Sequence, residues 1–244
     1  MSYYRGPYGG GGMTLAFPPV TPMVKVILWT LGACFFLQYF FTRAGLGIVP
    51  AYLALSPDML LRPPFAIWQL ATYALLHGNL WHLLGNLFGI WMFGGDVERM
   101  LGSRGFLRFF LITILGGGLA HAVLGLLAKN PVPVIGASAA VLGLVLAFAM
   151  FYPDRRVILF PIPIPVTART LALIYGAIDL YLAIEANPGD PTAHIAHLGG
   201  LAAAYLYIKG FIRPGGWRLG LRWPRRRRGF RVIRGRRDDP FDIN

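Results

Sequence analysis

The hydrophobic positions of this chain gather in six long runs, separated by shorter segments that carry charge, Pro or Gly. A helix needs about 20 apolar residues to cross the hydrocarbon core of a bilayer, and the runs reach or approach that length. The pattern therefore predicts an all-α, polytopic membrane protein. We place its six transmembrane helices at residues 23–42, 80–93, 106–127, 138–152, 166–184 and 193–212.

Composition agrees with this pattern. The chain has 244 residues, of which 56% are hydrophobic and only 14% charged, and this is too apolar for an ordinary soluble domain. The single cysteine, Cys34, lies inside an apolar run and has no partner for a disulfide within the chain.

The segments outside the runs predict three regions. Residues 1–20 are rich in Gly and Tyr, and we expect a flexible cytoplasmic tail. Residues 21–212 form the six-span domain, with a Pro-rich but largely apolar loop at 43–67 that suits the membrane interface. Residues 213–244 contain 11 Arg and 3 Asp, so much of the chain's net charge of +13 lies in this segment. We expect this tail to contact anionic lipid heads, and no motif indicates nucleic-acid binding.

The Lys and Arg residues between the runs predict the orientation, because cytoplasmic loops carry an excess of both. Arg99, Arg104 and Arg108 lie between runs two and three or just inside run three. Arg155, Arg156 and Arg169 lie between runs four and five or just inside run five, and the Arg-rich tail follows run six. Both termini are therefore expected on the cytoplasmic side. Runs two, four and six then begin at the outer face.

This topology brings complementary polar residues to the same depth. His82 and Asn86 lie near the start of run two, Ser138 opens run four, and His194 and His197 lie near the start of run six. A Ser hydroxyl becomes a nucleophile when a base takes its proton, and either His194 or His197 is a candidate base.

Acyl transfer also needs donors aimed at the developing oxyanion. His82 and Asn86 are spaced i, i+4 and so share one helix face. Gly136 allows a tight turn that leaves unpaired backbone N–H groups at the mouth of the helix beginning at Ser138.

Three motifs in these runs resemble the rhomboid family of intramembrane serine proteases. They are Gly136-Ala137-Ser138-Ala139 in run four, His82-Leu83-Leu84-Gly85-Asn86 in run two, and His197-Leu198-Gly199-Gly200 in run six. The resemblance covers roughly residues 68–207, and the order of the motifs and the number of helices between them agree with the family pattern.

The resemblance implies a six-helix rhomboid-like bundle in which Ser138 is the nucleophile and His197 the general base of a dyad. It implies an oxyanion site made of His82, Asn86 and the Ser138 backbone N–H. It implies an endopeptidase, a hydrolase that cleaves transmembrane protein substrates near the outer face and uses no metal or other cofactor. The location we expect is the bacterial inner membrane.

Three residues depart from the family pattern. Ala139 stands where Gly is usual, and its methyl is expected to tighten the turn at the oxyanion site. Gln69 follows Trp68 where some members have Arg. Ala204 ends the small-residue pattern of run six and should still allow close helix packing.

Other assignments remain open or favour structural roles. His197 is preferred to His194 as the base, because Gly200 and Ala204 follow His197 at helical spacing. Asp179 is an isolated charge in run five that can orient a histidine, although the family pattern does not require it. Glu98 favours a helix cap or an ion pair.

The alternative function is a catalytically inactive rhomboid-like protein that binds transmembrane client helices. A transporter would instead place polar residues through both leaflets. No His-Glu-x-x-His sequence indicates a zinc protease, and Asp179 has no second intramembrane Asp for an aspartyl dyad.

Overall fold

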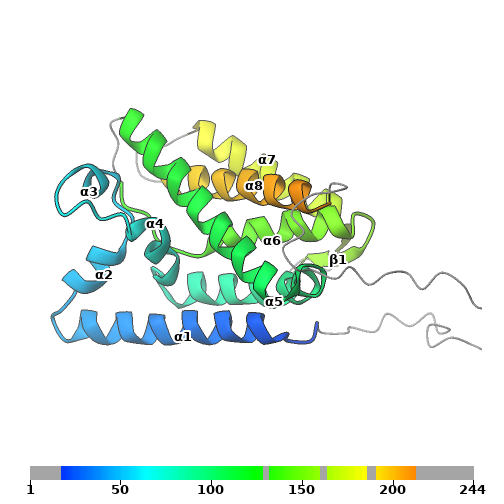
Figure 1. Ribbon diagram of the computed structural model, residues 1–244, viewed down its shortest axis with the longest axis horizontal. Helices are drawn as coiled ribbons and strands as arrows, with labels where there is room; N and C mark the ends of the chain where they lie inside the picture. Colours follow the sequence, from blue (N-terminus) through cyan, green and yellow to red (C-terminus); the bar gives the residue numbers. More distant parts are fainter. Residues whose placement is uncertain (1–17, 129–131, 160–163, 186–190, 213–244) are drawn as a thin grey trace, which may run out of the picture.

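Helices make up most of the computed structural model, which describes residues 18–128, 132–159, 164–185 and 191–212. The expected Arg-rich tail and nearly all of the expected N-terminal tail lie outside these ranges. The elements are α1 (Pro22–Arg43), α2 (Ile48–Leu53), α3 (Pro57–Leu61), α4 (Gln69–Thr72), η1 (Tyr73–Leu75), α5 (Leu80–Leu127), α6 (Ser138–Phe151), β1 (Arg156–Leu159), β2 (Ile164–Thr167), α7 (Ala168–Glu185) and α8 (Pro191–Ile212) (Figure 1).

Runs two and three join into one element, α5. Its two halves run in different directions (Figure 1), and the helical geometry breaks at Gly102, where φ is 71° and ψ is 158°. Glycine adopts this conformation without the steric penalty that a Cβ atom brings. The prediction that run two ends at Phe93 is therefore wrong by about two turns.

The additional turns of α5 are polar but buried. Asp96 is 7% exposed and Glu98 3%. Arg99 and Arg155 both pair with the Asp96 carboxylate, at 2.5 and 2.7 Å. The N–H groups of Met23 and Val24 donate to Glu98. Of the two structural roles left open for Glu98, a helix cap and an ion pair, these bonds show the cap, and the capped helix is α1.

Small residues bring α5, α6 and α8 into close contact. A Cβ atom on Gly199 would lie 2.6 Å from the carbonyl oxygen of Gly116, and one on Gly200 would lie 2.5 Å from that of Ala139. Ala204 is fully buried and would lie 3.3 Å from a Cβ on Gly143. As expected, Ala204 allows α8 to pack closely on α6.

A short antiparallel hairpin precedes α7. In it Arg156 pairs with Thr167 and Leu159 with Ile164. The predicted run 166–184 therefore begins inside β2, and its helix starts at Ala168. The β-branched residues Val166 and Thr167 suit the strand, a preference that hydrophobicity alone does not express.

The loop at 43–67 folds into α2, α3 and their connections. The Gln69 side chain, 1% exposed, accepts from the N–H of Ser56 at 3.0 Å and donates to the Tyr52 carbonyl at 3.0 Å. Leu55 and Val134 exchange backbone hydrogen bonds at 3.1 and 2.9 Å. Gln69 thus organises the loop, and the Leu55–Val134 bridge ties it to the segment that enters α6.

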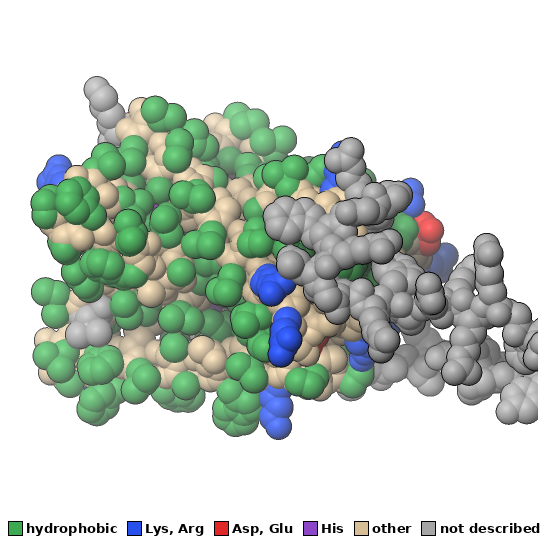
Figure 2. All heavy atoms as spheres, in the orientation of Figure 1, with side chains coloured by type: hydrophobic (Ala, Val, Ile, Leu, Met, Phe, Trp, Pro, Cys, Tyr) green, Lys and Arg blue, Asp and Glu red, His purple; other side chains and the backbone are tan. Residues whose placement is uncertain are grey.

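Two of the described helices, α1 and α5, are long and apolar enough to cross a membrane, and α6 is a shorter apolar helix. Trp29 and Phe36 of α1 are 73% and 72% exposed, so this helix presents a large apolar face. Figure 2 shows hydrophobic side chains over most of the visible described surface, with most visible Lys and Arg toward the end where α1 begins. The six-span bundle and its orientation remain predictions.

Candidate functional site

The chain turns sharply just before Ser138, the first residue of α6. Gly136 has φ of +119°, and its N–H donates to the Tyr73 carbonyl at 2.9 Å. Tyr73 is itself fixed, because its hydroxyl donates to the Ile114 carbonyl of α5 at 2.8 Å. These bonds set the position at which the Ser138 side chain leaves the backbone.

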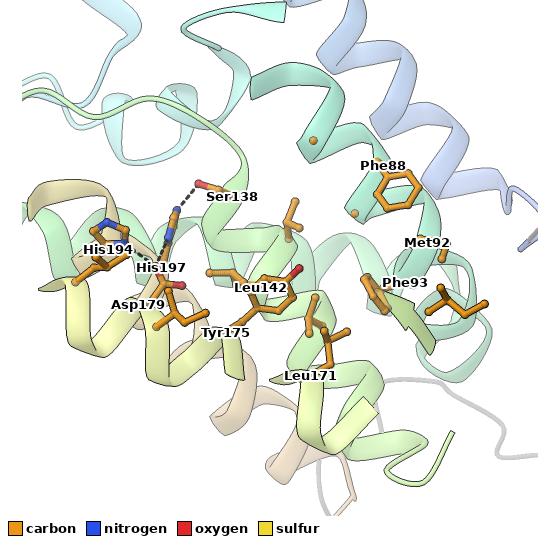
Figure 3. Close-up of a pocket in the computed structure, with 17 residues that line it drawn as sticks. Phe88, Met92, Phe93, Ser138, Leu142, Leu171, Tyr175, Asp179, His194 and His197 are labelled. Atoms are coloured by element: carbon orange, nitrogen blue, oxygen red, sulfur yellow. Dashed lines mark hydrogen bonds and ion pairs between the residues drawn. The ribbon is translucent and has the colours of Figure 1, made fainter. Parts of the chain in front are cut away.

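Ser138, His197 and Asp179 form one hydrogen-bonded series (Figure 3). The Ser138 Oγ atom lies 2.6 Å from His197 Nε2, and His197 Nδ1 lies 2.8 Å from Asp179 Oδ1. A carboxylate only accepts hydrogen bonds, so Nδ1 carries the imidazole proton. In the neutral ring, Nε2 is then unprotonated and can accept the proton of Ser138.

His194 shares the same carboxylate oxygen. Its Nδ1 atom lies 2.7 Å from Asp179 Oδ1, and its ring centroid lies 5.8 Å from that of His197. The sequence interpretation made His194 the less favoured of the two candidate bases. The residue does line the cavity described below, but its contact with Asp179 was not anticipated.

Asp179 is the functional candidate to which the sequence interpretation gave too little weight. Its side chain is 9% exposed, and its hydrogen-bonding partners among the described residues are two histidines of α8. The available signal was an acidic residue without an obvious partner in an apolar run. A buried charge needs a partner, and the two histidines at the start of the next run were the nearest candidates.

His82 lies beside the turn at Gly136. A Cβ on Gly136 would meet His82 Nε2 at 2.6 Å and Ser138 Oγ at 3.8 Å, so the imidazole and the hydroxyl face the same small volume. Asn79 caps α5, accepting from the His82 N–H at 2.8 Å. This cap fixes the first turn of the helix that carries His82.

Asn86 follows one turn later on α5. The residue is 5% exposed, and its amide nitrogen has no hydrogen-bond partner among the described residues. A buried donor without a hydrogen-bond acceptor is uncommon, because it has lost its hydrogen bonds to water and gained none within the protein. Asn86 therefore has a free N–H group close to His82 along the helix.

His77 and His121 support the backbone around the site. The N–H of His77 donates to Gln38 Oε1 at 3.0 Å, and Gln38 Nε2 donates to the His77 carbonyl at 2.9 Å. Burial lowers the pKa of the His77 imidazole to about 4, and the neighbouring His82 adds in the same direction, so His77 is neutral at pH 7. His121 Nε2 lies 2.9 Å from the Val132 carbonyl.

A cavity of about 340 Å³ opens beside Ser138. Figure 3 shows Ser138, Asp179, His194 and His197 at one end of it and Phe88, Met92 and Phe93 toward the other. Leu142 of α6 and Leu171 and Tyr175 of α7 lie between them. The cavity thus has a polar end that contains the Ser138 hydroxyl and an apolar length that suits hydrophobic side chains.

One group of side chains in the described part of the chain has the composition and spacing of a metal site. It consists of Asp179, His194 and His197, whose ligand atoms all lie within 4.8 Å of one another. Two of these residues also belong to the series that ends at Ser138. A metal ion would therefore occupy the His197 Nδ1 and Asp179 Oδ1 atoms whose hydrogen bond orients His197 toward Ser138.

Comparison with known proteins gives a consistent result. The Rhomboid domain family matches residues 64–214, which is more than half of the chain. The chain belongs to the rhomboid family. The matched residues of this rhomboid protein extend from the loop before α4 to just beyond α8, and they include Ser138, His197 and Asp179.

Curated relatives agree with this assignment. Rhomboid protein 1, mitochondrial, of Saccharomyces cerevisiae is 30% identical over 137 residues, covering 55% of this chain and 39% of the relative. RHOMBOID-like protein 12, mitochondrial, of Arabidopsis thaliana is 30% identical over 149 residues, covering 55% and 44%. Rhomboid protease GluP of Bacillus subtilis is 31% identical over 138 residues, covering 56% and 25%. The matched stretch is thus less than half of each relative.

The rhomboid motif residue Ala139 packs against glycines of two other helices. It is 1% exposed, and its Cβ would lie 2.7 Å from a Cβ on Gly117 and 3.0 Å from one on Gly200. The absence of side chains at these two glycines makes room for the methyl group. The expectation that the methyl tightens the oxyanion site finds no support in this packing.

Proposed function

We propose that this rhomboid protein is an intramembrane serine endopeptidase in which Ser138 is the nucleophile and His197 the general base. The observation that carries the proposal is the continuous series of hydrogen bonds from Ser138 Oγ through His197 to Asp179. The wider setting is an integral membrane protein with six spans and both termini in the cytoplasm, in the inner membrane of a bacterium.

The first step transfers the Ser138 hydroxyl proton to His197 Nε2 while Oγ attacks the carbonyl carbon of the scissile peptide bond. A tetrahedral intermediate forms, and its oxyanion needs preorganised donors. The Ser138 N–H, the His82 imidazole and the free amide N–H of Asn86 supply them. The protonated His197 then donates its Nε2 proton to the departing amine, and the acyl-enzyme remains on Ser138.

The second step hydrolyses the acyl-enzyme. His197, neutral again, takes a proton from water, and the resulting hydroxide attacks the ester carbon. Collapse of the second tetrahedral intermediate returns the proton to Ser138 Oγ. Asp179 acts as a positioning residue throughout, because its carboxylate holds the proton on Nδ1 and stabilises the imidazolium that forms twice per turnover.

The substrate class follows from the cavity. Its apolar length beside Ser138 suits the hydrophobic side chains of a transmembrane segment, and its polar end admits water. A peptide bond inside a regular helix is shielded by the helix's own hydrogen bonds. Substrates are therefore transmembrane proteins whose helices are weakened by Gly, Pro or polar residues near the outer face.

Cleavage by the purified full-length chain in liposomes tests the proposal. The substrate is a single-span protein with a Gly-rich outer end, and the products are identified by mass spectrometry. Parent protein should cleave it, while Ser138→Ala and His197→Ala should not. Binding of the uncleaved substrate by folded parent protein would instead identify a catalytically inactive, client-binding relative.

A further inference from the structure

Asp179 has one more histidine partner than the proposed reaction needs. His197 connects the carboxylate to Ser138. His194 also contacts the carboxylate, but none of its described contacts is to a reacting atom. The side chains of both histidines are 17% exposed and line the cavity, so a small solute can reach them.

We propose that Asp179, His194 and His197 bind a divalent transition-metal ion of the zinc type, and that the bound ion inhibits the protease. The inhibition rests on the proposed function, whereas the binding does not. The ligand set is two imidazole nitrogens and one carboxylate oxygen, a combination found at zinc sites that keep an open coordination position.

The geometry needs only a small adjustment. Zinc bonds of about 2.0–2.2 Å in a tetrahedral arrangement place neighbouring ligand atoms roughly 3.3 Å apart. The two nitrogen–oxygen separations are 2.7 and 2.8 Å, and all three atoms lie within 4.8 Å of one another. The carboxylate therefore has to withdraw by about half an ångström while the two rings turn toward each other.

The ligand types also predict selectivity. Imidazole nitrogen favours Zn²⁺, Cu²⁺ and Ni²⁺, while Mg²⁺ and Ca²⁺ prefer sites built entirely of oxygen. With a single carboxylate oxygen among three ligand atoms, this group should discriminate strongly against Mg²⁺ and Ca²⁺. Water or chloride completes the coordination.

The inhibition follows from where the imidazole proton lies. Before binding, neutral His197 carries its proton on Nδ1 and accepts from Ser138 through Nε2. A metal ion takes the Nδ1 lone pair, and the proton of the still neutral ring then resides on Nε2. The Nε2–H group donates to Ser138 Oγ instead of accepting its proton, so the nucleophile loses its base while the hydrogen bond between them persists.

This mechanism predicts a distinct kinetic signature. The ion does not fill the apolar length of the cavity, where the substrate is proposed to bind. Zn²⁺ should therefore lower kcat with little change in KM. It should also suppress labelling of Ser138 by a fluorophosphonate, because that reaction needs the same base.

The test uses the full chain in detergent, freed of any affinity tag and of bound metal. Co²⁺, a spectroscopic substitute for Zn²⁺, is titrated into parent, His194→Gln and His121→Gln, and its visible absorption reports the site. Parent and His121→Gln should both bind. His194→Gln should require at least about 10-fold more metal, since even outer-shell partners are worth 10- to 100-fold in affinity.

The outcomes separate the two proposals. Co²⁺ binding that depends on His194, in a protein that never cleaves, would uphold the site and overturn the proposed function. Two results would overturn the metal site. One is a parent protein that cleaves substrate but gives no Co²⁺ spectrum. The other is a His194→Gln variant whose Co²⁺ spectrum and Zn²⁺ inhibition are the same as those of the parent. Unfolding temperatures of all variants show that each is folded.

Discussion

Two buried carboxylates, Glu98 on α5 and Asp179 on α7, differ in their hydrogen-bond donors. Glu98 accepts from the backbone N–H groups of Met23 and Val24 at 3.0–3.1 Å and from the Ser103 hydroxyl at 2.6 Å, and it also binds the Thr21 hydroxyl. None of these donors changes protonation near neutral pH. Asp179 accepts from two imidazoles, and one of them reaches a hydroxyl.

The difference shows that burial alone does not identify a functional carboxylate. Glu98 compensates the unpaired N–H groups at the start of α1 and fixes that helix on α5 just before the bend at Gly102. Asp179 instead contacts groups that can carry a proton. The chemistry of the partners, and not the cost of burial that both residues share, separates the structural site from the candidate catalytic one.

Substitution of the two carboxylates is expected to differ most in its effect on cleavage activity. Asp179→Asn retains the shape of the side chain but removes its charge and can favour the wrong His197 tautomer. We expect cleavage to fall by about 10- to 10⁴-fold, the upper limit being the loss found for the corresponding change in a serine protease triad. The unfolding temperature should change little, and the loss should appear in kcat.

A structural role for Asp179 would give a different pattern. Cleavage would then fall only in proportion to the folded fraction, and Asp179→Glu would rescue folding and activity together. Full activity in Asp179→Asn would remove the positioning role and leave Ser138 and His197 as a dyad.

The reverse pattern is expected for Glu98→Gln. The new amide group presents a donor toward backbone N–H groups that are themselves donors, and an unsatisfied buried group costs about 1–3 kcal/mol. The denaturation midpoint in detergent should fall, while cleavage per folded molecule stays within a factor of two or so, roughly the scatter of such effects. A large loss of kcat at unchanged stability would contradict the comparison.

Part of this contrast was predictable from the sequence and part was not. The position of Glu98 at the end of an apolar run predicted a structural role, either a helix cap or an ion pair. Its partners at the start of α1 lie 74 to 77 residues away, and no local pattern identifies them. The same long-range contacts extend α5 past Phe93, since they satisfy the polar residues at which the apolar run ended.

The sequence predicted those site residues whose positions follow from the spacing within a single helix. Ser138, His82, Asn86 and His197 were selected from their positions in three runs, and the structure brings Ser138 into contact with His197 and places His82 beside Gly136. The pairing of Asp179 with both histidines depends on how α7 and α8 are rotated against each other. That rotation is set by packing and is not visible in the spacing of a single run.

A smaller effect is expected from Gly200→Ala, which tests whether α8 must approach α6 closely. The new Cβ would lie 2.5 Å from the Ala139 carbonyl oxygen, a backbone atom that cannot move freely. Overpacking of this kind costs about 1–3 kcal/mol, and the displaced α8 should lengthen the Ser138–His197 contact and reduce cleavage.

Gly176→Ala on α7 is the matched control. Among the described residues, a Cβ there would meet Leu201 alone, at 3.9 Å, and alanine is the better helix former. Equal destabilisation by the two substitutions would show that the close contact at Gly200 is not the cause.

The smallest effect is expected from Ala139→Gly, which restores the usual family residue. The methyl group packs between Gly117 and Gly200. Stability should fall by no more than about 1 kcal/mol, the helix-propensity difference between the two residues, and cleavage should change by less than roughly 10-fold. A larger gain in cleavage rate would show that the methyl does restrict the oxyanion site.

The central claim is that His197 activates Ser138, and covalent labelling tests it most directly. Folded full-length protein is treated with a fluorophosphonate in metal-free detergent, and the modified residue is located by mass spectrometry. We expect modification at Ser138 in the parent and in His194→Gln, and none in Ser138→Ala or His197→Ala. Modification that persists in Ser138→Ala, or that is as fast in His197→Ala as in the parent, would contradict the account.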